Sequence, residues 1–342
     1  MDFLCIENIP SSIFLSYPPV RTTGGFLFCR FSVGRAAPRC KSAANVLLLL
    51  LVSSAAFCAG IIWNVFLWQH RTIPALRLKH RSGGCDVGST YTKAVILDEN
   101  GKICADTTIR SKINSEVSAK LAMEEVLNKV GLNSSEELGY LIGTGYGRNK
   151  VPFADENISE ISCHAMGVHV TDPSVKAIID IGGQDVKGIS IDTDGTVKNF
   201  AMNDKCAAGT GRFYEAMARS FEMSLPEFSN LSLTAKNVIP ITAQCTVFAE
   251  SEVITLVGEG KPMDEIAAGI QMAVAKRCFV MSKKAGATDA ITLTGGCAKN
   301  AGLKQAIEHV LKLKVIDLKT DPQLMGALGA AEYARQKGLA RA

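Results

Sequence analysis

The most restrictive feature of this chain is an internal repeat. Asp86 opens the run Asp-Val-Gly-Ser and Lys93 begins an apolar strand, while Asp180 opens Asp-Ile-Gly-Gly and Lys187 follows at the same spacing. Each copy reads as a strand, an Asp-x-Gly turn, a second strand, a hairpin turn and a return strand. One copy in each half of the chain predicts two related lobes with a cleft between them.

Apolar periodicity around the repeat predicts alternating strands and helices, which is typical of an α/β fold. Helices are expected at residues 116–130, 158–170, 210–221, 247–257, 264–284, 300–311 and 325–337, and a last strand at 314–317. We expect a first lobe at residues 84–178, onto which the closing helix could pack back, and a second lobe at 179–318.

Glycine-rich turns end three of the expected strands, at Gly88, at Gly182–Gly183 and at Gly295–Gly296. Such turns present backbone N–H groups with little side-chain obstruction, which suits phosphate oxygens. One turn alone is weak support, because hairpins contain glycine for conformational reasons. Two matched turns and a third favour a phosphate-binding cleft.

Asp86 and Asp180 are expected to face each other across this cleft. A pair of carboxylates beside a phosphate site can hold Mg²⁺, usually through its waters, and can orient an attacking water. Either aspartate could equally be a residue that caps its turn. Gln184 and Asp185 stand where a side chain that positions water is useful, and Lys93 could neutralise phosphate or simply be solvated.

Cys206 and Cys245 each stand in a polar turn that runs into an expected helix. A helix N-terminus stabilises a thiolate, so such a pair suits a negatively charged iron–sulfur cluster. Two cysteines cannot complete a four-thiolate set, and the simplest source of the other two is the same pair on a second copy of the chain. The alternative is that both are buried structural thiols, as most scattered cysteines are.

The eleven cysteines are odd in number, widely spaced and without a Cys-x-x-Cys pair. This usage argues against a disulfide scaffold or a zinc site, and for a reducing compartment. Cys85, Cys104, Cys278 and Cys297 lie in apolar segments and are expected to be core or loop thiols. His164 is interpreted as a packing or hydrogen-bonding residue of its helix rather than as a metal ligand.

Residues 1–83 look foreign to the rest of the chain, and the lead-in from Lys79 to Cys85 is a poor strand before Asp86. Residues 43–68 carry no charge and exceed the about 20 apolar residues that cross a bilayer. This leader is a signal anchor, an uncleaved signal peptide or a segment outside the working protein, and the poor strand favours the last. We expect a cytoplasmic protein, associated with a membrane if residues 43–68 are genuine. The leader inflates the net charge of +4, and the charges from residue 84 onward nearly balance. The rest of the chain therefore has no excess positive charge that would point to nucleic-acid binding.

The paired Asp-x-Gly loops and the Thr-Gly-Gly turn resemble those of the superfamily of acetate and sugar kinases, heat-shock chaperones and actin. Within it, residues 84–338 resemble the BadF/BadG/BcrA/BcrD-type ATPase family, the activators of 2-hydroxyacyl-CoA dehydratases. The spacing of the two cysteines also fits the family pattern. The motifs that carry the resemblance are Asp86-Val-Gly-Ser-Thr-Tyr-Thr-Lys-Ala94, Gly143-Thr-Gly-Tyr-Gly-Arg148, Glu160-Ile-Ser-Cys-His164, Asp180-Ile-Gly-Gly-Gln-Asp-Val-Lys187, Lys205-Cys-Ala-Ala-Gly-Thr-Gly-Arg-Phe213 and Cys245-Thr-Val-Phe-Ala-Glu-Ser-Glu252.

This resemblance implies a duplicated actin-like ATPase fold with a nucleotide cleft between its lobes. It implies a homodimer with ATP, Mg²⁺ and one bridging [4Fe–4S] cluster, held by Cys206 and Cys245 of each copy. ATP hydrolysis would drive an electron from a reduced ferredoxin or flavodoxin to the dehydratase. The residues implied for catalysis and for nucleotide and Mg²⁺ binding are Asp86, Gly88, Ser89, Thr90, Lys93, Asp180, Gly182, Gly183, Gln184, Gly295 and Gly296.

Three other functions stay open at the level of sequence. The ATPase subunit of a benzoyl-CoA-reductase-type complex shares the motifs and the cluster, and differs mainly in its partner. A plain sugar or acyl kinase needs a substrate-binding insertion, for which residues 221–238 are too short, and no paired cysteines. A chaperone-like ATPase needs an appended peptide-binding domain, and nothing resembling one follows Lys314. Neither the acyl-CoA of the partner nor the electron donor is identified.

Overall fold

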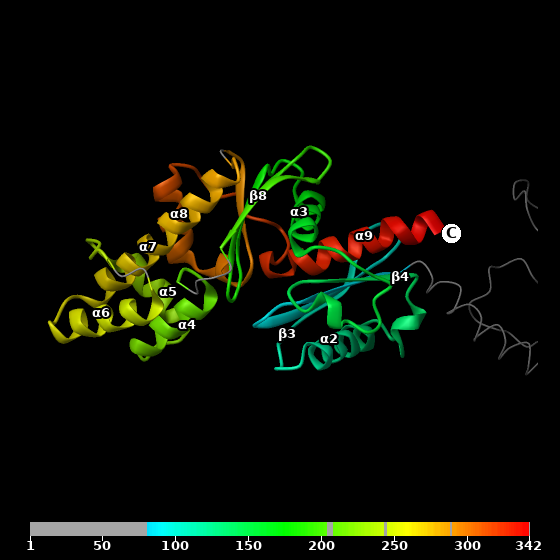
Figure 1. The fold of residues 1–342 in the computed structure, drawn as a ribbon, viewed down its shortest axis with the longest axis horizontal. Coiled ribbons are helices and arrows are strands. Elements are labelled where there is room, and N and C mark those ends of the chain that lie inside the picture. Colours follow the sequence, from blue (N-terminus) through cyan, green and yellow to red (C-terminus); the bar gives the residue numbers. More distant parts are fainter. Residues whose placement is uncertain (1–80, 204–207, 243–244, 288, 342) are drawn as a thin grey trace, which may run out of the picture. The chain divides into compact units, whose positions relative to one another are not determined.

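The computed structural model describes residues 81–203, 208–242, 245–287 and 289–341 (Figure 1). The chain divides into two compact units, Met1–Ile73 and Pro74–Ala342, and every described residue belongs to the second. The expected membrane segment at 43–68 and almost all of the leader lie outside the described residues, as does Cys206. No helix in the described ranges is both long and apolar enough to span a membrane.

The first lobe is built on a five-stranded sheet with the strand order β3-β2-β1-β4-β5. Helix α2 (Ser115–Lys129) packs on one face, and helix α9 (Met325–Arg341) packs on the other beside α3 (Glu160–Thr171). Figure 1 shows α9, in red, alongside the strands of this sheet and α3. The strands are β1 Ser82–Val87, β2 Tyr91–Leu97, β3 Ile103–Arg110, β4 Tyr140–Thr144 and β5 Glu156–Asn157.

The second lobe is built on a four-stranded sheet with the order β8-β7-β6-β9. Its strands are β6 Ala177–Ile181, β7 Val186–Ile191, β8 Val197–Asn203 and β9 Ile291–Thr294. Helix α7 (Met263–Lys284) packs against this sheet and against α8 (Ala301–Leu311). The other helices of this lobe are α4 Gly211–Ser220, α5 Leu225–Leu231 and α6 Thr246–Gly258. Short 3₁₀ turns lie at Ser135–Glu137, Arg148–Lys150, Ser232–Thr234, Gly296–Lys299 and Pro322–Leu324.

The two sheets repeat one topology. In each, the first strand pairs antiparallel with the second and parallel with a later strand, β4 in one lobe and β9 in the other. The register is also repeated, because Asp86 lies opposite Lys93 and Asp180 lies opposite Lys187. The predicted duplication is therefore confirmed in the fold, residue by residue at the positions that matter for the cleft.

The start of the first lobe differs from the sequence expectation. Residues 82–85 form the first part of β1, the middle strand of its sheet, where a poor strand was expected. A Cβ added to Gly84 would lie 2.1 Å from the carbonyl oxygen of Ala327 in α9. The helix backbone packs directly on the strand, so glycine is required there by tertiary packing although its strand propensity is low.

The expected strand at 314–317 is also wrong. Only a single parallel bridge forms, between Ile316 and Thr292 of β9. The backbone N–H of Val315 donates to the Glu308 side chain at 3.0 Å instead of to a neighbouring strand, and Lys312 is left-handed with φ of 56°. The seven expected helices all form, and their bounds differ from expectation by a few residues.

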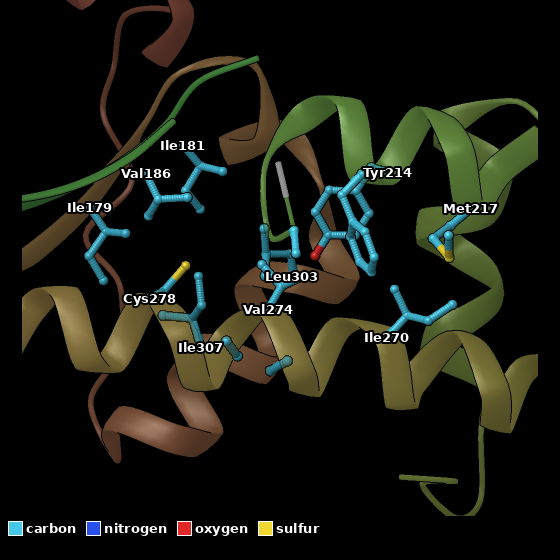
Figure 2. Packing of buried hydrophobic residues seen from close by; sticks show 14 of the residues in the cluster. Ile179, Ile181, Val186, Tyr214, Met217, Ile270, Val274, Cys278, Leu303 and Ile307 are labelled. Carbon is cyan, nitrogen blue, oxygen red and sulfur yellow. The ribbon is translucent and has the colours of Figure 1, made fainter. Parts of the chain in front are cut away.

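The core of the second lobe joins its sheet to α4, α7 and α8. Figure 2 shows Ile179, Ile181 and Val186 of the sheet on one side and Tyr214 and Met217 of α4 on the other, with α7 side chains between them. Tyr214 and Met217 are among the largest fully buried side chains of the described residues. Helix α4 is therefore anchored in the core along the face that carries these two residues.

Replacing Gly329 by alanine is expected to destabilise the protein. The new Cβ would lie 1.8 Å from the carbonyl oxygen of Cys163, where α9 crosses α3. Overpacking of this kind lowers the free energy of unfolding by about 1–3 kcal/mol. The matched control is Gly338→Ala in the same helix, whose Cβ would meet nothing nearer than 3.6 Å. Chemical denaturation compares the two, and equal losses would contradict the close helix contact.

Candidate functional site

A cleft of about 540 Å³ is lined by residues of both lobes. The turns that follow β1, β6 and β9 meet there, as expected from the repeat. All eleven residues implied for nucleotide and Mg²⁺ binding line it: Asp86, Gly88, Ser89, Thr90, Lys93, Asp180, Gly182, Gly183, Gln184, Gly295 and Gly296. The structure thus brings the set together, while the role of each residue stays a prediction.

Each lobe contributes an aspartate paired with the lysine opposite it in the hairpin. Lys93 Nζ lies 2.8 Å from Asp86 Oδ2 in the first lobe. In the second lobe, Lys187 Nζ lies 3.2 Å from Asp180 Oδ2 and 2.6 Å from Asp185 Oδ2. Neither lysine is a solvated strand end, and neither extends freely to a phosphate in this arrangement.

The second pair is the more deeply buried, and its charges are firmly held. Burial alone would raise the pKa of Asp180, but His164, Lys187 and the hydrogen bond from Thr294 outweigh it and hold that pKa well below its usual range. Burial alone would lower the pKa of Lys187, but Asp180, Asp185 and Glu160 raise it above its usual value. Both groups are therefore charged at neutral pH.

His164 has a place in the cleft that the sequence did not indicate. The Thr294 hydroxyl donates to Asp180 Oδ1 at 2.9 Å, so its oxygen accepts from His164 Nδ1 at 3.1 Å, and Nδ1 carries the proton. On the other side of the ring, Nε2 and Asp86 Oδ2 would each lie 2.9 Å from a Cβ on Gly326. His164 is therefore a hydrogen-bonding residue, as expected, and its bond places it between the two aspartates.

Glu160 also lines the cleft, and the sequence analysis named it within a family motif but gave it no role. Its carboxylate lies 3.5 Å from both Lys187 Nζ and Arg148 Nη1. Glu160 and His164 are four residues apart in α3 and both line the cleft. Their spacing of four residues places them on one face of α3, and that signal could have identified them.

The glycine turns approach one another closely enough to exclude side chains. Gly295 has φ of 81°, and its Cβ would lie 2.4 Å from the Ile181 carbonyl oxygen. A Cβ on Gly183 would lie 2.0 Å from Thr90 Oγ1, so the loops of the two lobes touch. Within the described residues, the Thr90 hydroxyl is buried without a hydrogen-bond partner. An unused donor beside glycine N–H groups fits phosphate oxygens.

The far end of the cleft is formed by residues that sequence reasoning did not single out. Leu225, Pro226, Ser229 and Asn230 of α5 line it together with Asn300. The Asn300 oxygen accepts from Ser229 Oγ at 2.8 Å and from Gln271 Nε2 at 3.2 Å, which links α5, α7 and the start of α8. The sequence analysis treated 221–238 only as a connection too short for an insertion.

Cys245 lies at the N-cap of α6 and is exposed, which differs from the buried structural thiol considered as the alternative. Burial raises the pKa of the Cys163 and Cys278 thiols to about 12, as expected of inert core cysteines. Within the described ranges, no group of three or more His, Cys, Asp and Glu side chains could hold a metal ion. The other proposed ligand, Cys206, lies outside those ranges.

Replacing Lys187 by methionine is expected to cost about 3–5 kcal/mol of unfolding free energy, because it leaves buried carboxylates without their cation. The pKa of Lys187 is raised in the folded protein. Its contribution to the free energy of unfolding is therefore complete at any pH below the pKa that it has in the unfolded chain, and is lost only at strongly alkaline pH. In the folded variant, the unpaired carboxylates bind protons more readily than in the unfolded chain. The difference in unfolding free energy between wild type and variant therefore becomes smaller on acidification.

Denaturation of both proteins between about pH 5 and pH 9 measures this difference, a range in which the wild-type pair keeps its charges. Lys176→Met is the control, because its ion pair with Asp289 is exposed. A stability difference between wild type and Lys187→Met that does not change with pH would contradict a buried, charged Asp180–Lys187 pair. An equal loss of unfolding free energy in the control would contradict it as well.

Comparison with known proteins identifies close relatives. The chain is 45% identical over 251 residues to the activator of lactoyl-CoA dehydratase of Anaerotignum propionicum, covering 73% of this chain and 96% of that protein. The activator of 2-hydroxyisocaproyl-CoA dehydratase from Clostridium difficile, solved with bound ADPNP, matches at 41% identity and a TM-score of 0.72, over 76% of this chain and 96% of that one.

Component A of the (R)-2-hydroxyglutaryl-CoA dehydratase of Acidaminococcus fermentans matches at 40% identity and a TM-score of 0.71, over 76% of this chain and 99% of that one. The expected duplicated actin-like ATPase fold is confirmed by these likenesses and by the repeated sheet topology. The sequence pattern of the BadF/BadG/BcrA/BcrD ATPase family matches residues 84–334. The chain therefore belongs to the BadF/BadG/BcrA/BcrD ATPase family.

Proposed function

We propose that this protein is an ATP-hydrolysing activator that delivers a low-potential electron to a 2-hydroxyacyl-CoA dehydratase. The observation that carries the proposal is the cleft in which both Asp–Lys pairs and all three glycine turns meet. It occurs in a chain that is 45% identical to a protein named as an activator of lactoyl-CoA dehydratase. Electron transfer, the donor and the dimer are part of the proposal.

ATP would lie in the cleft with its phosphates against the glycine turns. The Thr90 hydroxyl and the backbone N–H of Gly183 are suitable donors to phosphate oxygens, while the N–H of Gly182 donates to the Asp185 carbonyl oxygen at 3.0 Å and keeps the loop in shape. Asp86 and Asp180 would hold Mg²⁺ through its waters, and the magnesium would neutralise phosphate charge. Asp180 suits this role because its low pKa keeps the carboxylate ionised.

The two lysines and His164 keep these carboxylates in place. Lys187 binds the Oδ2 atom of Asp180, and Thr294 binds its Oδ1 atom, so the carboxylate plane is held from two sides. Gln184 lines the cleft beside Asp180 and is proposed to orient the water that attacks the terminal phosphate. Hydrolysis then needs little chemistry from the protein beyond positioning and charge.

The electron carrier would be one [4Fe–4S] cluster shared by two copies of the chain, each supplying Cys206 and Cys245. Cys245 fits a ligand role, because its thiol is exposed at the start of α6 and not buried in the core. The helix N-terminus favours the thiolate that a cluster requires. A reduced ferredoxin or flavodoxin would supply the electron, in the cytoplasm, where such thiols remain reduced.

The protein purified without oxygen is expected to contain about four irons and four sulfides for each pair of chains. Cys245→Ser and Cys206→Ser are expected to lose this iron, because each removes two of the four thiolates in a dimer. Cys104→Ser is the matched control, since Cys104 is also exposed and is not a proposed ligand. Iron and sulfide analysis measures the outcome, and unchanged iron in Cys245→Ser would reject the cluster assignment.

Asp180→Asn is expected to lower the rate of ATP hydrolysis by about 10²–10³-fold, the order of loss when one electrostatically stabilising group of an active site is removed. The variant also leaves Lys187 with one carboxylate fewer, so its folding is checked by denaturation. Asp289→Asn, at an exposed carboxylate, is the control. Phosphate release under saturating ATP is the measurement, and wild-type turnover in Asp180→Asn would contradict the assigned site.

A further inference from the structure

We propose that Arg212 is a positioning residue that ties the second-lobe phosphate loop, Gly182–Asp185, to the first turn of α4. The inference deepens the proposed function, because the loop is assigned there to ATP phosphates and Gln184 to the attacking water. Arg212 lies in α4, outside the strands and turns that form the loop. Its role is to hold Gln184 and to pass movement of the loop to the helix.

The backbone of α4 is bonded directly to the phosphate loop. The N–H of Gly211 donates to the Gly182 carbonyl oxygen at 2.9 Å, and the N–H of Arg212 donates to the Gly183 carbonyl oxygen at 3.0 Å. Both are amides of the first turn, which have no partner inside the helix. A Cβ on Gly211 would lie 3.3 Å from the Gly182 oxygen, so the absence of a side chain permits this close approach.

The Arg212 side chain adds a third link. The Gln184 carboxamide oxygen lies against the Arg212 guanidinium, 3.0 Å from Nη1, 3.1 Å from Nε and 2.9 Å from Nη2. A guanidinium has only donors, so it selects the oxygen end of the amide. The amide nitrogen of Gln184 is thereby left as a donor for another partner. Arg212 thus decides which end of this cleft residue is available to the nucleotide.

Helix α4 can carry a movement of the loop onward as a unit. Phe213, Tyr214 and Met217 are buried in the second-lobe core, and Figure 2 shows the last two on the inner face of the helix. Because core side chains are closely packed, the first turn cannot shift without the rest of the helix. In the sequence, Arg212 follows Cys206 by only six residues, so one end of this short connection is the proposed cluster ligand.

Hydrogen exchange on the iron-free full chain tests the proposal without the cluster. Wild type, Arg212→Ala and Arg212→Lys are compared with and without ADPNP, following residues 177–190 and residues 209–218. The control is Arg219→Ala, an exposed arginine seven residues later in the same helix. ATP turnover is measured in the same four proteins.

In wild type, ADPNP is expected to slow exchange in both segments. In Arg212→Ala, ADPNP should still slow exchange in residues 177–190. In residues 209–218 the slowing by ADPNP should fall at least about fivefold, because the helix amides then open independently of the loop. The kcat for ATP should fall about tenfold with an unchanged KM, as for loss of one charge-assisted hydrogen bond. Arg212→Lys should be intermediate, since the ammonium keeps the charge but loses the planar guanidinium that contacts the amide oxygen. Arg219→Ala should resemble wild type.

Three results would overturn the inference. A full response of 209–218 in Arg212→Ala would mean that the arginine transmits nothing. Loss of both responses would make Arg212 a nucleotide-binding residue and not a positioning residue. A wild type in which 177–190 ignores ADPNP would reject the nucleotide site of the proposed function as well. Absence of iron in the separate cluster analysis would reject only the cluster. Failure of the cluster assignment is therefore distinguished from failure of the nucleotide site and of the role of Arg212.

Discussion

Asp180 is 3% exposed, and the arrangement of the cleft follows from the need to satisfy its negative charge. An unpaired buried carboxylate costs several kcal/mol or takes up a proton. Lys187 of β7, Thr294 of β9 and His164 of α3 all contact it. The hairpin partner β7, helix α3 and the distant strand β9 therefore meet at one carboxylate, and an ionised group is kept beside the proposed phosphate site.

Asp86 has the same place in the first lobe, but its surroundings are different. Lys93 is its cation, and a Cβ on Gly145 or on Gly326 would lie 2.4 Å or 2.9 Å from its carboxylate oxygens, so these two positions leave no room for a side chain. The repeat therefore preserves the aspartate and its lysine, while Asp185 and Glu160 reinforce only the second lysine. This asymmetry suits a site in which one lobe holds a fixed charge and the other approaches it when the lobes close.

The duplication made much of the fold and cleft predictable, because each Asp–Lys pair and each glycine turn depends on local strand and hairpin geometry. The contacts that could not be predicted are those made by tertiary packing. Gly84 belongs to a central strand because α9 packs directly on it, and His164 reaches Thr294 across 130 positions of sequence. Arg212 reads locally as one more charged residue near a helix start, and only the folded loop shows its contact with Gln184.

The two helices that follow the proposed cluster ligands are themselves in contact, and this gives the coupling a second route. Helix α4 follows the Cys206 segment, and α6 begins directly after Cys245. Ser220, at the end of α4, donates to Glu250 of α6 at 3.3 Å. A movement that enters α4 at Arg212 would therefore reach α6 within the same copy. Both thiolates of one copy would then respond to the same phosphate loop. Such a shared response is needed if the surroundings of a cluster on a two-fold axis are to change symmetrically.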